Sequence, residues 1–386
     1  MAPRPERCAG ANVVHMYTVT RVDADTFRTS RESWNTLAAA MPYPTVFCSW
    51  EWIYSWFERF NRERDRWVLF VHRDGELKGI LPLFRERRWL HRDARLGQVL
   101  GYGGVPELFP DPLDIIAAQA DAAACMNAIL EYLRHHSGEW DVLHLRFATQ
   151  DSCIARALPK ADESFTRTEA ISAAPYISIT GSYEQYLQTL SSNERSNVRR
   201  RRRKLLEGQG VVYTDFASQE PWRVLQRLLD LHERRAAEKE IQSTFGGPAI
   251  SAFHDDLLKR LNRSKVWLRG LKRGEDVIAV FYGFVDGANV AYYQLGYDPE
   301  WSDSSPGSVL LQETIREAHD RGLKEYNFLQ GEEGFKYRWT SSFRPLYAVD
   351  LFNRSLFGRL SRSLIAAKRL IRPSRAQTVA APAENP

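Results

Sequence analysis

The stretch that decides the fold begins at Asn289 and ends at Phe343: NVAYYQLGYDPEWSDSSPGSVLLQETIREAHDRGLKEYNFLQGEEGFKYRWTSSF. It predicts a strand, a Ser/Pro/Gly turn, an apolar-periodic helix, a second strand and a polar loop, at residues 291–297, 304–308, 309–321, 325–329 and 331–339. Gly322 directly follows the helix, as is common at a helix C-terminus. The expected unit is therefore β-α-β, with the start of its helix left open.

A helix start at this place suits an anionic group, because its first backbone N–H groups have no partner within the helix. Ser305, Gly307 and Ser308 can present amides and hydroxyls to a diphosphate, and Gln294 lies in the strand that precedes the turn. An ordinary N-cap with a proline near the first helical position explains the same residues without any ligand.

Candidate acid–base groups lie in the first strand and after the second. Glu332 and Glu333 occupy a Gly-flanked loop, where a desolvated carboxylate can act as a general base; a solvated acidic turn is the alternative. Lys336 lies among aromatic residues, and its cation can stabilise an oxyanion or simply run along apolar surface. Alternation lets only one of Tyr292 and Tyr293 face the cleft and does not decide which; we take Tyr293 as the candidate proton donor. These groups indicate an acyl-transferring enzyme.

The bulk properties indicate a globular protein. The chain has 386 residues, 44% hydrophobic content and a net charge of +5, which allows two or three domains. No apolar run approaches the roughly 18 residues of a membrane span, and the first residues lack the apolar core of a secretory signal. The cysteines, and the His and carboxylate residues, show no metal-type or redox spacing. We therefore expect reduced thiols, a cytoplasmic protein and no metal.

Positive charge is concentrated in two segments. Residues 195–204 hold seven basic residues and no acid within a predicted helix. Their mutual repulsion favours a polyanionic partner, such as a nucleotide-sugar, lipid-linked or tRNA phosphate or a membrane surface, against a plain solvated helix. Residues 353–375 predict a basic amphipathic helix, which either docks on the body or makes peripheral contact with an anionic membrane. The candidate substrate-binding residues are Arg195, Asn197, Arg199, His232, Tyr337 and Trp339, although a lone histidine such as His232 is more often a core residue.

The predicted elements divide the chain into two halves of similar order. We predict an N-terminal domain over residues 16–165 and a C-terminal catalytic domain over residues 166–352. A disordered segment, 1–15, precedes them, and the tail at 353–386 is expected to be partly disordered. Residues 151–175 show no clear period and are expected to connect the halves, whereas residues 182–208 predict one helix.

Four local patterns, in their order along the chain, resemble the FemAB-like acetyltransferase families of the GNAT superfamily that are found with bacterial exopolysaccharide and cellulose synthesis genes. The patterns are FCSWEW at 47–52 with GILPL at 79–83, SNERSNVRR at 192–200, LHERR at 231–235, and the stretch from SPG at 305–307 to Lys336. The resemblance covers about residues 40–350. It implies an α/β (α+β) fold of two tandem GNAT-like domains, each a mixed, mostly antiparallel sheet flanked by helices.

The resemblance also implies an activity. An acyl group, first of all acetyl, would pass from acyl-coenzyme A to an amine or hydroxyl of a small-molecule, glycan or lipid-linked precursor of the cell envelope or a polysaccharide, with no role for DNA. Lys336 is similar to the lysine of the Phe-Lys-x-x-Phe arrangement of Fem-type enzymes, which is implicated in acyl transfer, with Trp339 in place of the second Phe.

Two positions depart from the family pattern. Asn327 stands where members often have Asp, and the turn at 304–308 lacks the Gln/Arg-x-x-Gly-x-Gly/Ala form of typical GNAT enzymes. Two alternatives therefore stay open. One is an aminoacyl-tRNA-dependent ligase of the Fem type, which the arginine run favours, and the other is a non-catalytic GNAT-like scaffold at the membrane.

Overall fold

The structure is a computed structural model, and it describes residues 17–60, 64–91, 94–105, 107–108, 110–161, 163–216, 219–238 and 245–371. The segments expected to be disordered, at the start of the chain and at the end of the tail, lie outside these residues. The strands are β1 (Tyr17–Arg21), β2 (Asp65–Arg73), β3 (Glu76–His91), β4 (Ala94–Tyr102), β5 (Ile116–Ala117), β6 (Val142–Thr149), β7 (Thr166–Ser178), β8 (Val212–Asp215), β9 (Val266–Arg273), β10 (Asp276–Asp286), β11 (Asn289–Tyr297), β12 (Glu325–Asn327) and β13 (Phe343–Phe352).

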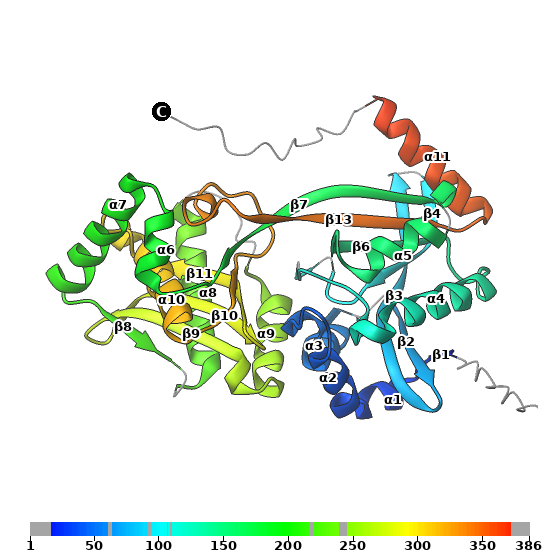
Figure 1. Cartoon of the computed structure of the whole chain (residues 1–386), viewed down its shortest axis with the longest axis horizontal. Helices are drawn as coiled ribbons and strands as arrows, with labels where there is room; N and C mark the ends of the chain where they lie inside the picture. Colours follow the sequence, from blue (N-terminus) through cyan, green and yellow to red (C-terminus); the bar gives the residue numbers. More distant parts are fainter. Residues whose placement is uncertain are drawn as a thin grey trace, which may run out of the picture.

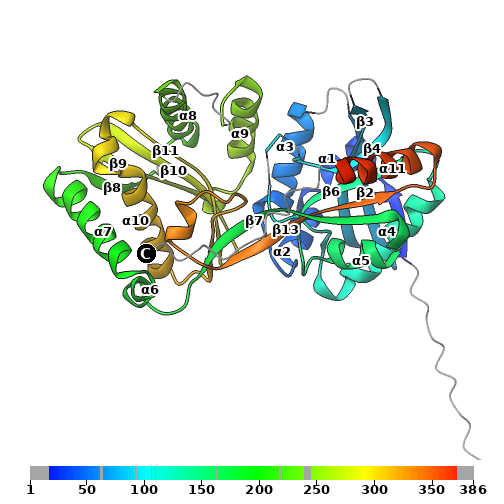
Figure 2. The same cartoon turned by 90° about the horizontal axis from the view of Figure 1, so that it is seen from above.

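The helices lie on both sides of these strands. They are α1 (Ala24–Thr29), α2 (Arg31–Ala39), α3 (Trp50–Phe60), α4 (Gln119–His135), α5 (Cys153–Ala161), α6 (Tyr183–Thr189), α7 (Ser192–Arg202), α8 (Pro221–Glu238), α9 (Pro248–Arg260), α10 (Pro306–Asp320) and α11 (Leu356–Ile371). In the second half, α8 and α9 cover one face of the sheet, and α6, α7 and α10 cover the other (Figure 2).

Within the described residues the strands form one continuous sheet, in the order β1-β2-β3-β4-β6-β13-β7-β12-β11-β10-β9-β8, with β5 beside β3. Most neighbours are antiparallel, and each half holds one parallel pair around a helix: β4 with β6 around α4, and β11 with β12 around α10. The predicted fold of two GNAT-like units in an α/β arrangement is confirmed. The two halves lie side by side, and the long strands β7 and β13 run between them (Figure 1).

Strand β13 comes last along the chain but lies within the sheet of the first half. It pairs with β6 from Leu346 to Phe352, and with β7 from Phe343 to Leu351. β7 continues past this contact, and its end at 176–178 pairs with β12 of the second half. Both crossing strands therefore tie the halves into one sheet.

Residues 151–175 connect the halves as predicted, but they do so as regular structure, α5 and most of β7. One local prediction was wrong. The helix predicted over 182–208 is broken at Leu190, because two N-caps compete within it: the side chains of Ser182 and Ser191 each accept a backbone N–H three residues ahead. Arg195 donates to the carbonyls of Gln188 and Leu190, which closes the end of α6.

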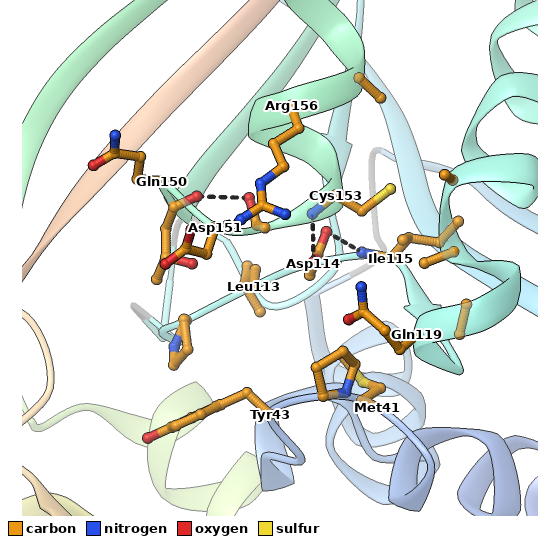
Figure 3. A pocket seen from close by; sticks show the side chains of 18 of the residues that line it. Met41, Tyr43, Leu113, Asp114, Ile115, Gln119, Gln150, Asp151, Cys153 and Arg156 are labelled. Atoms are coloured by element: carbon orange, nitrogen blue, oxygen red, sulfur yellow. Dashed lines mark hydrogen bonds and ion pairs between the residues drawn. The ribbon is translucent and has the colours of Figure 1, made fainter.

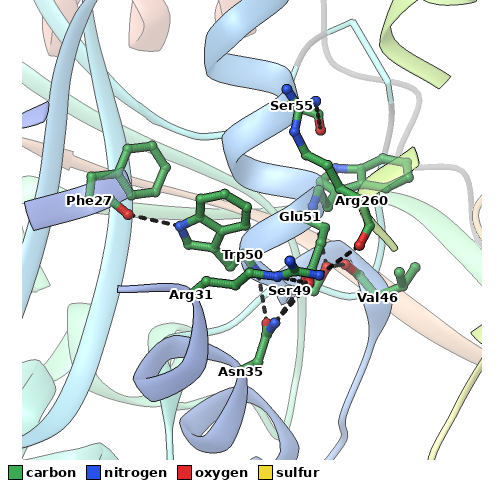
Figure 4. A network of polar contacts seen from close by, with 10 residues as sticks. Phe27, Arg31, Asn35, Val46, Ser49, Trp50, Glu51, Ser55 and Arg260 are labelled. Carbon is green, nitrogen blue, oxygen red and sulfur yellow. Dashed lines mark hydrogen bonds and ion pairs between the residues drawn. The ribbon is translucent and has the colours of Figure 1, made fainter. Parts of the chain in front are cut away.

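A buried polar network joins the first half to α9 of the second (Figure 4). Glu51 is almost fully buried, and its carboxylate accepts hydrogen bonds from Arg31 and Asn35 at 2.8–3.0 Å. Arg31 also donates to the carbonyl of Arg260, whose own guanidinium donates to Ser55. The carboxylate is thus satisfied inside the protein, as a buried charge must be, and the WEW pattern has a structural role here.

Candidate active site

The site lies where β11 and β12 separate. The two strands pair only over three residues, with Ala291 opposite Asn327 as the last pair. β11 continues to Tyr297, but Leu329 takes a left-handed conformation (φ +57°) and turns the chain away. Asn327 fixes this turn, since its side-chain oxygen accepts the N–H of Leu329 at 2.8 Å and its amide donates to the Tyr43 hydroxyl. A gap therefore opens between the strands.

Asp111 from the first half reaches this gap. A small cavity of about 10 Å³ is bounded there by Asp111, Ala291, Asn327 and Leu329, among others. One carboxylate oxygen of Asp111 accepts the N–H of Gln330 at 2.8 Å, whereas the other is buried without a partner among the described residues. Burial raises the pKa of Asp111 to about 7, although the Gln330 N–H and the charge of Lys336 oppose the shift. A carboxyl that titrates near neutrality and has a free oxygen is equipped to act as a general base.

Sequence reasoning missed Asp111. It lies in the loop between β4 and β5, and the DP dipeptide at 111–112 indicates only a turn. Its partners come from the other half of the chain, so no local pattern marks it.

Lys336 is turned inward rather than along the surface. Its side chain is only 4% exposed, and its ammonium donates to the carbonyls of Gln330 at 2.6 Å and Leu329 at 3.3 Å. The carboxylate of Glu333 lies 3.0 Å from the same nitrogen. An ammonium has three hydrogens, so these partners use its full capacity. Lys336 therefore fixes the backbone that Asp111 also contacts.

The other predicted residues of this loop lie nearer the surface. Glu332 is exposed, and the side chain of Glu333 is 57% exposed. Tyr337 is half-buried, and burial together with the charges of Glu332 and Glu333 raises its pKa. Trp339 is buried, and its carbonyl accepts the hydroxyl of Tyr186. The two glutamates thus lie on the solvent-exposed side of the loop, whereas Trp339 packs in the core and fixes the end of the loop.

The two tyrosines of β11 lie on opposite faces of the sheet, next to a bulge in the β10–β11 pairing. Tyr292 packs against Phe328 and Phe335, beside the loop that carries Lys336. Tyr293 packs in an aromatic cluster with Trp52 on the α9 side, and its hydroxyl donates to the carbonyl of Leu108 at 3.3 Å. Burial raises the pKa of both hydroxyls. Gln294 lies next along β11, opposite Tyr282 of β10.

Basic side chains converge on the start of α10. Arg201 donates to the Ser308 hydroxyl at 3.4 Å, and Lys204 donates to the carbonyl of Asp303 at 3.0 Å. Ser305 precedes the helix in a left-handed conformation and makes no side-chain cap. A Cβ on Gly307 would lie 2.9 Å from the Tyr297 ring, so this glycine lets α10 approach β11 closely. Part of the arginine run thus supplies positive charge at the predicted diphosphate turn.

The rest of the run has other partners. Arg202 forms an ion pair with the buried Glu313 of α10, and Arg199 pairs with Glu184 on the surface. Asn197 is half-buried and bonds to Asn193 and Arg200 within α7. Arg202 thus holds α7 against α10, whereas Arg195 and Arg199 hold it against α6.

His232 lies on α8, on the opposite face of the sheet from α10. It approaches the backbone of Gly296 and the ring of Phe245. Burial, and then the charge of Arg235, lower its pKa to about 4, and its Nε2 is buried without a partner among the described residues. It is therefore a neutral imidazole at physiological pH.

A cavity with a volume of about 910 Å³ lies in the first half (Figure 3). Its walls come from α4, α5, the loop after Asp111 and the start of β13, and none of the residues predicted from the sequence lines it. Tyr43 and Pro112 belong to both this cavity and the small one beside Asp111. Asp114 shapes the wall by accepting the backbone N–H groups of Ile115, Cys153 and Ile154.

The described residues include neither a metal-type cluster nor a membrane-spanning helix. No group of three or more His, Cys, Asp and Glu side chains is placed to hold a metal ion. None of the helices there is long and apolar enough to cross a membrane.

Comparison with known proteins agrees with this architecture. Residues 192–337 match the model of the acetyltransferase (GNAT) domain. The fold is similar to that of FemX (TM-score 0.62, 10% identity, covering 89% of this chain and 100% of that one). It is also similar to the C-terminal domain of a putative lysylphosphatidylglycerol synthetase from Agrobacterium fabrum (0.55, 10%, 89% and 97%) and to a conserved protein of unknown function from Bacteroides thetaiotaomicron (0.55, 13%, 87% and 100%). No curated protein matches the sequence. Residues 192–337 thus match a GNAT domain, and the chain as a whole has a fold similar to that of FemX.

Proposed function

We propose that this chain transfers an acyl group, first of all acetyl, from acyl-coenzyme A to an amine or hydroxyl of a cell-envelope or polysaccharide precursor. The observation that carries the proposal is the convergence of Arg201 and Lys204 on the start of α10. A diphosphate there would meet two cations and the N–H of Gly307, because Pro306 has no N–H and the N–H groups of Ser308 and Val309 are bonded to the Ser305 carbonyl. The phosphate turn lacks the basic or amide residue of typical GNAT enzymes, and α7 supplies the missing charge from elsewhere in the chain.

The gap between β11 and β12 gives the donor a route from this turn to Asp111. We propose that the thioester carbonyl lies at the gap, where Ala291 and Asn327 are the last paired residues. The acceptor lone pair attacks the carbonyl carbon, and Asp111 takes the acceptor proton. The C–S bond then breaks, and the proton on Asp111 is available to the departing thiolate. Tyr293, on the α9 side of the sheet, is the proposed alternative donor of the proton to the thiolate. The turnover of the Tyr293→Phe variant tests this role.

Lys336 and the loop glutamates have separate proposed roles. Lys336 positions Gln330 through its hydrogen bond to the backbone. Its ammonium also contacts the exposed Glu333, and it can exchange this contact for one with the oxyanion of the tetrahedral intermediate. Glu332 and Glu333 lie at the surface, where their charge attracts a cationic amine.

We place the acceptor in the 910 Å³ cavity, because that volume suits a bound ligand and the cavity shares Tyr43 and Pro112 with the space beside Asp111. Its lining combines amides with cations and carboxylates, which suits a polar acceptor such as a glycan: Gln119, Asn127, Gln150, Arg134, Arg156, Lys160, Glu131 and Asp151. The Asn127→Leu variant should raise the KM for the acceptor at least about tenfold and leave the KM for acyl-coenzyme A unchanged. The acceptor group that loses its hydrogen-bond partner would be buried and unsatisfied, which costs roughly 1–3 kcal/mol of binding free energy. An unchanged acceptor KM would move the acceptor elsewhere.

Calorimetric titration with acetyl-coenzyme A tests the donor site. The double variant Arg201→Ala/Lys204→Ala should bind at least about tenfold more weakly than the wild type, because hydrogen bonds to charged groups contribute roughly 1.5–3 kcal/mol. Arg199→Ala is the matched control, since this exposed arginine of the same helix pairs with Glu184. Equal affinity of all three proteins would remove the diphosphate from this turn.

A second candidate, an aminoacyl-tRNA-dependent ligase, is favoured by one observation. Arg199, Arg200 and Arg203 are exposed on α7 and the turn after it, beside the donor site, where an RNA backbone could be bound. Absence of coenzyme A binding by the wild type, together with an activity that ribonuclease abolishes, would select this function. Absence of any donor binding would select the scaffold.

The proposed location is the cytoplasm. Cys48, Cys125 and Cys153 are free thiols, and burial raises the pKa of each to about 12. Such thiols suit a reducing compartment.

A further inference from the structure

Helix α11 presents its apolar side to solvent. Leu356 is 79% exposed, and Phe357, Leu360 and Leu364 are 41–44% exposed. At 100° per residue these four side chains fall within about 100° of the helix circumference, so they form one stripe, which we call the α11 stripe. Elsewhere among the described residues, the large apolar side chains with comparable exposure are only Val212 and Trp222. The concentration on one helix is therefore not the ordinary scatter of surface residues.

The opposite side of α11 docks on the body, and it does so through small residues. Gly358 and Ser361 are buried, and a Cβ on Gly358 would lie 2.1 Å from the carbonyl oxygen of Asn353. Ile365 packs with Phe165 against the apolar residues at the end of the sheet. Docking on the body, one of the two predicted alternatives, is thus found, and it uses Gly and Ser because the helix backbone comes close to its neighbours.

The start of α11 is held firmly, so the stripe has a fixed direction. Asn353 donates to the carbonyls of Ser137 and Trp140, both at 2.6 Å. Ser355 donates to Asp141 and accepts the N–H of Gly358. The helix cannot turn its stripe inward without breaking these bonds.

The charged side chains of the segment that carries the stripe are all positive. Residues 353–383 contain no acid in the sequence. Arg354, Arg359 and Arg362 are exposed, and the guanidinium groups of Arg354 and Arg362 lie over the ring of Phe165, about 5 Å from its centre. Arg359 and Arg362 fall beside the stripe on the helix, between it and the body. An apolar face flanked by arginines matches a surface that is apolar inside and negative at its rim.

We propose that α11 anchors the protein to a bilayer that contains anionic lipids. The α11 stripe enters the boundary between headgroups and acyl chains, and the flanking arginines contact lipid phosphates. A second copy of the chain fits less well. The stripe spans nine residues, from Leu356 to Leu364, and is about 13 Å long, so at a width of about 10 Å it covers roughly 130 Å², against about 800 Å² per partner in a stable interface. A second copy would also add like charge.

The anchor does not depend on the proposed acyl transfer. α11 lies at one end of the first half, and α7 and α10 lie in the other half (Figure 1). Loss of membrane binding and loss of coenzyme A binding are therefore separate outcomes.

Vesicle flotation of the full-length protein tests the anchor. Vesicles of phosphatidylcholine with about 30% phosphatidylglycerol should bind the wild type at least about tenfold more strongly than pure phosphatidylcholine, and raising the salt from about 0.1 M to about 0.5 M should weaken binding. Leu360→Asp/Leu364→Asp should reduce binding at least about tenfold. The matched control, Val212→Asp/Trp222→Asp, introduces the same charge at two exposed apolar positions in the other half and should bind as the wild type does.

The proposal is overturned if the wild type does not float with anionic vesicles or if the Leu360/Leu364 variant floats equally well. It is also overturned if the variant differs from the wild type only by converting a dimer to a monomer, which would assign the stripe to a second copy. Circular dichroism of each variant checks that its fold is retained, and the exposed positions predict unchanged spectra.

Discussion

Asp111 and Lys336 both form hydrogen bonds with the backbone of Gln330. Asp111 accepts the N–H of Gln330 at 2.8 Å, and Lys336 donates to the carbonyl of Gln330 at 2.6 Å. The first comes from the N-terminal half and the second from the C-terminal half. The backbone between them is the segment that turns away from β11 and opens the gap. The geometry of the proposed reaction centre therefore depends on both halves at once.

Asp111→Asn should lower turnover at least about 100-fold, within the range usual for a general base. In the wild type, kcat/KM should fall as the pH drops below about 7, because protonation removes the base. In the variant this acidic limb should vanish. Asp25→Asn is the control, since this exposed carboxylate of the first half pairs with Arg28 on α1 and lines neither cavity. A variant with wild-type turnover and an unchanged pH profile would refute the assignment.

The same carboxyl should make stability depend on pH. Its pKa is about 7 in the folded protein against an ordinary value of 3.8, so the folded state binds the proton more tightly. The stabilisation is complete below about pH 4 and is lost as the pH rises to about 7. The free energy of unfolding of Asp111→Asn, relative to the wild type, should therefore rise by about 2–3 kcal/mol between about pH 5 and pH 8. Urea titrations at the two pH values measure it, and parallel curves would contradict the shift.

Lys336→Met should destabilise the protein by about 2–4 kcal/mol, because the buried carbonyls of Leu329 and Gln330 lose their donor. Turnover should fall at least about tenfold. A purely structural role would leave the pH profile in place, whereas loss of this positive charge should move the acidic limb of Asp111 to higher pH. Arg338→Met, at an exposed position of the same loop, should change neither quantity. An acidic limb that stays at the wild-type pH would exclude the electrostatic link.

A chain that ends at residue 342 should fail to fold its first half. β13 pairs with β6 along one edge and with β7 along the other, so its loss leaves two long strands without their partner. A chain that ends at residue 352 keeps β13 and loses only α11. Soluble yield and thermal melting of the two truncations compare them. Equal melting temperatures of the two truncations would show that the first half does not need β13. That result would favour the predicted domains, 16–165 and 166–352, as independent units.

Much of the fold was predictable because it is local. The hairpin around Gly75, the helix at α4 and the β-α-β unit from β11 to β12 follow from apolar period and turn residues. The place of β13 in the sheet was not predictable, because pairing with a strand some two hundred residues earlier leaves no local pattern in the sequence. The break between α6 and α7 was missed because the basic run seemed to continue one helix, although Ser191 offers an N-cap.

The site divides in the same way. Lys336 and Ser308 were found because they lie within one recognisable unit. Asp111 was not, since its importance comes from burial against Gln330 and from a pKa that only the folded environment raises. The arginine run indicated an anionic partner, but only the packing of α7 on α10 brings Arg201 and Lys204 to the helix start.

A crystal structure of the protein with coenzyme A tests the central claim most directly. We predict the diphosphate at residues 305–308, within hydrogen-bond reach of Arg201 and Lys204. We predict the sulfur in the gap between β11 and β12, beside the free oxygen of Asp111. Coenzyme A bound outside this gap, or with its diphosphate away from the start of α10, would contradict the account.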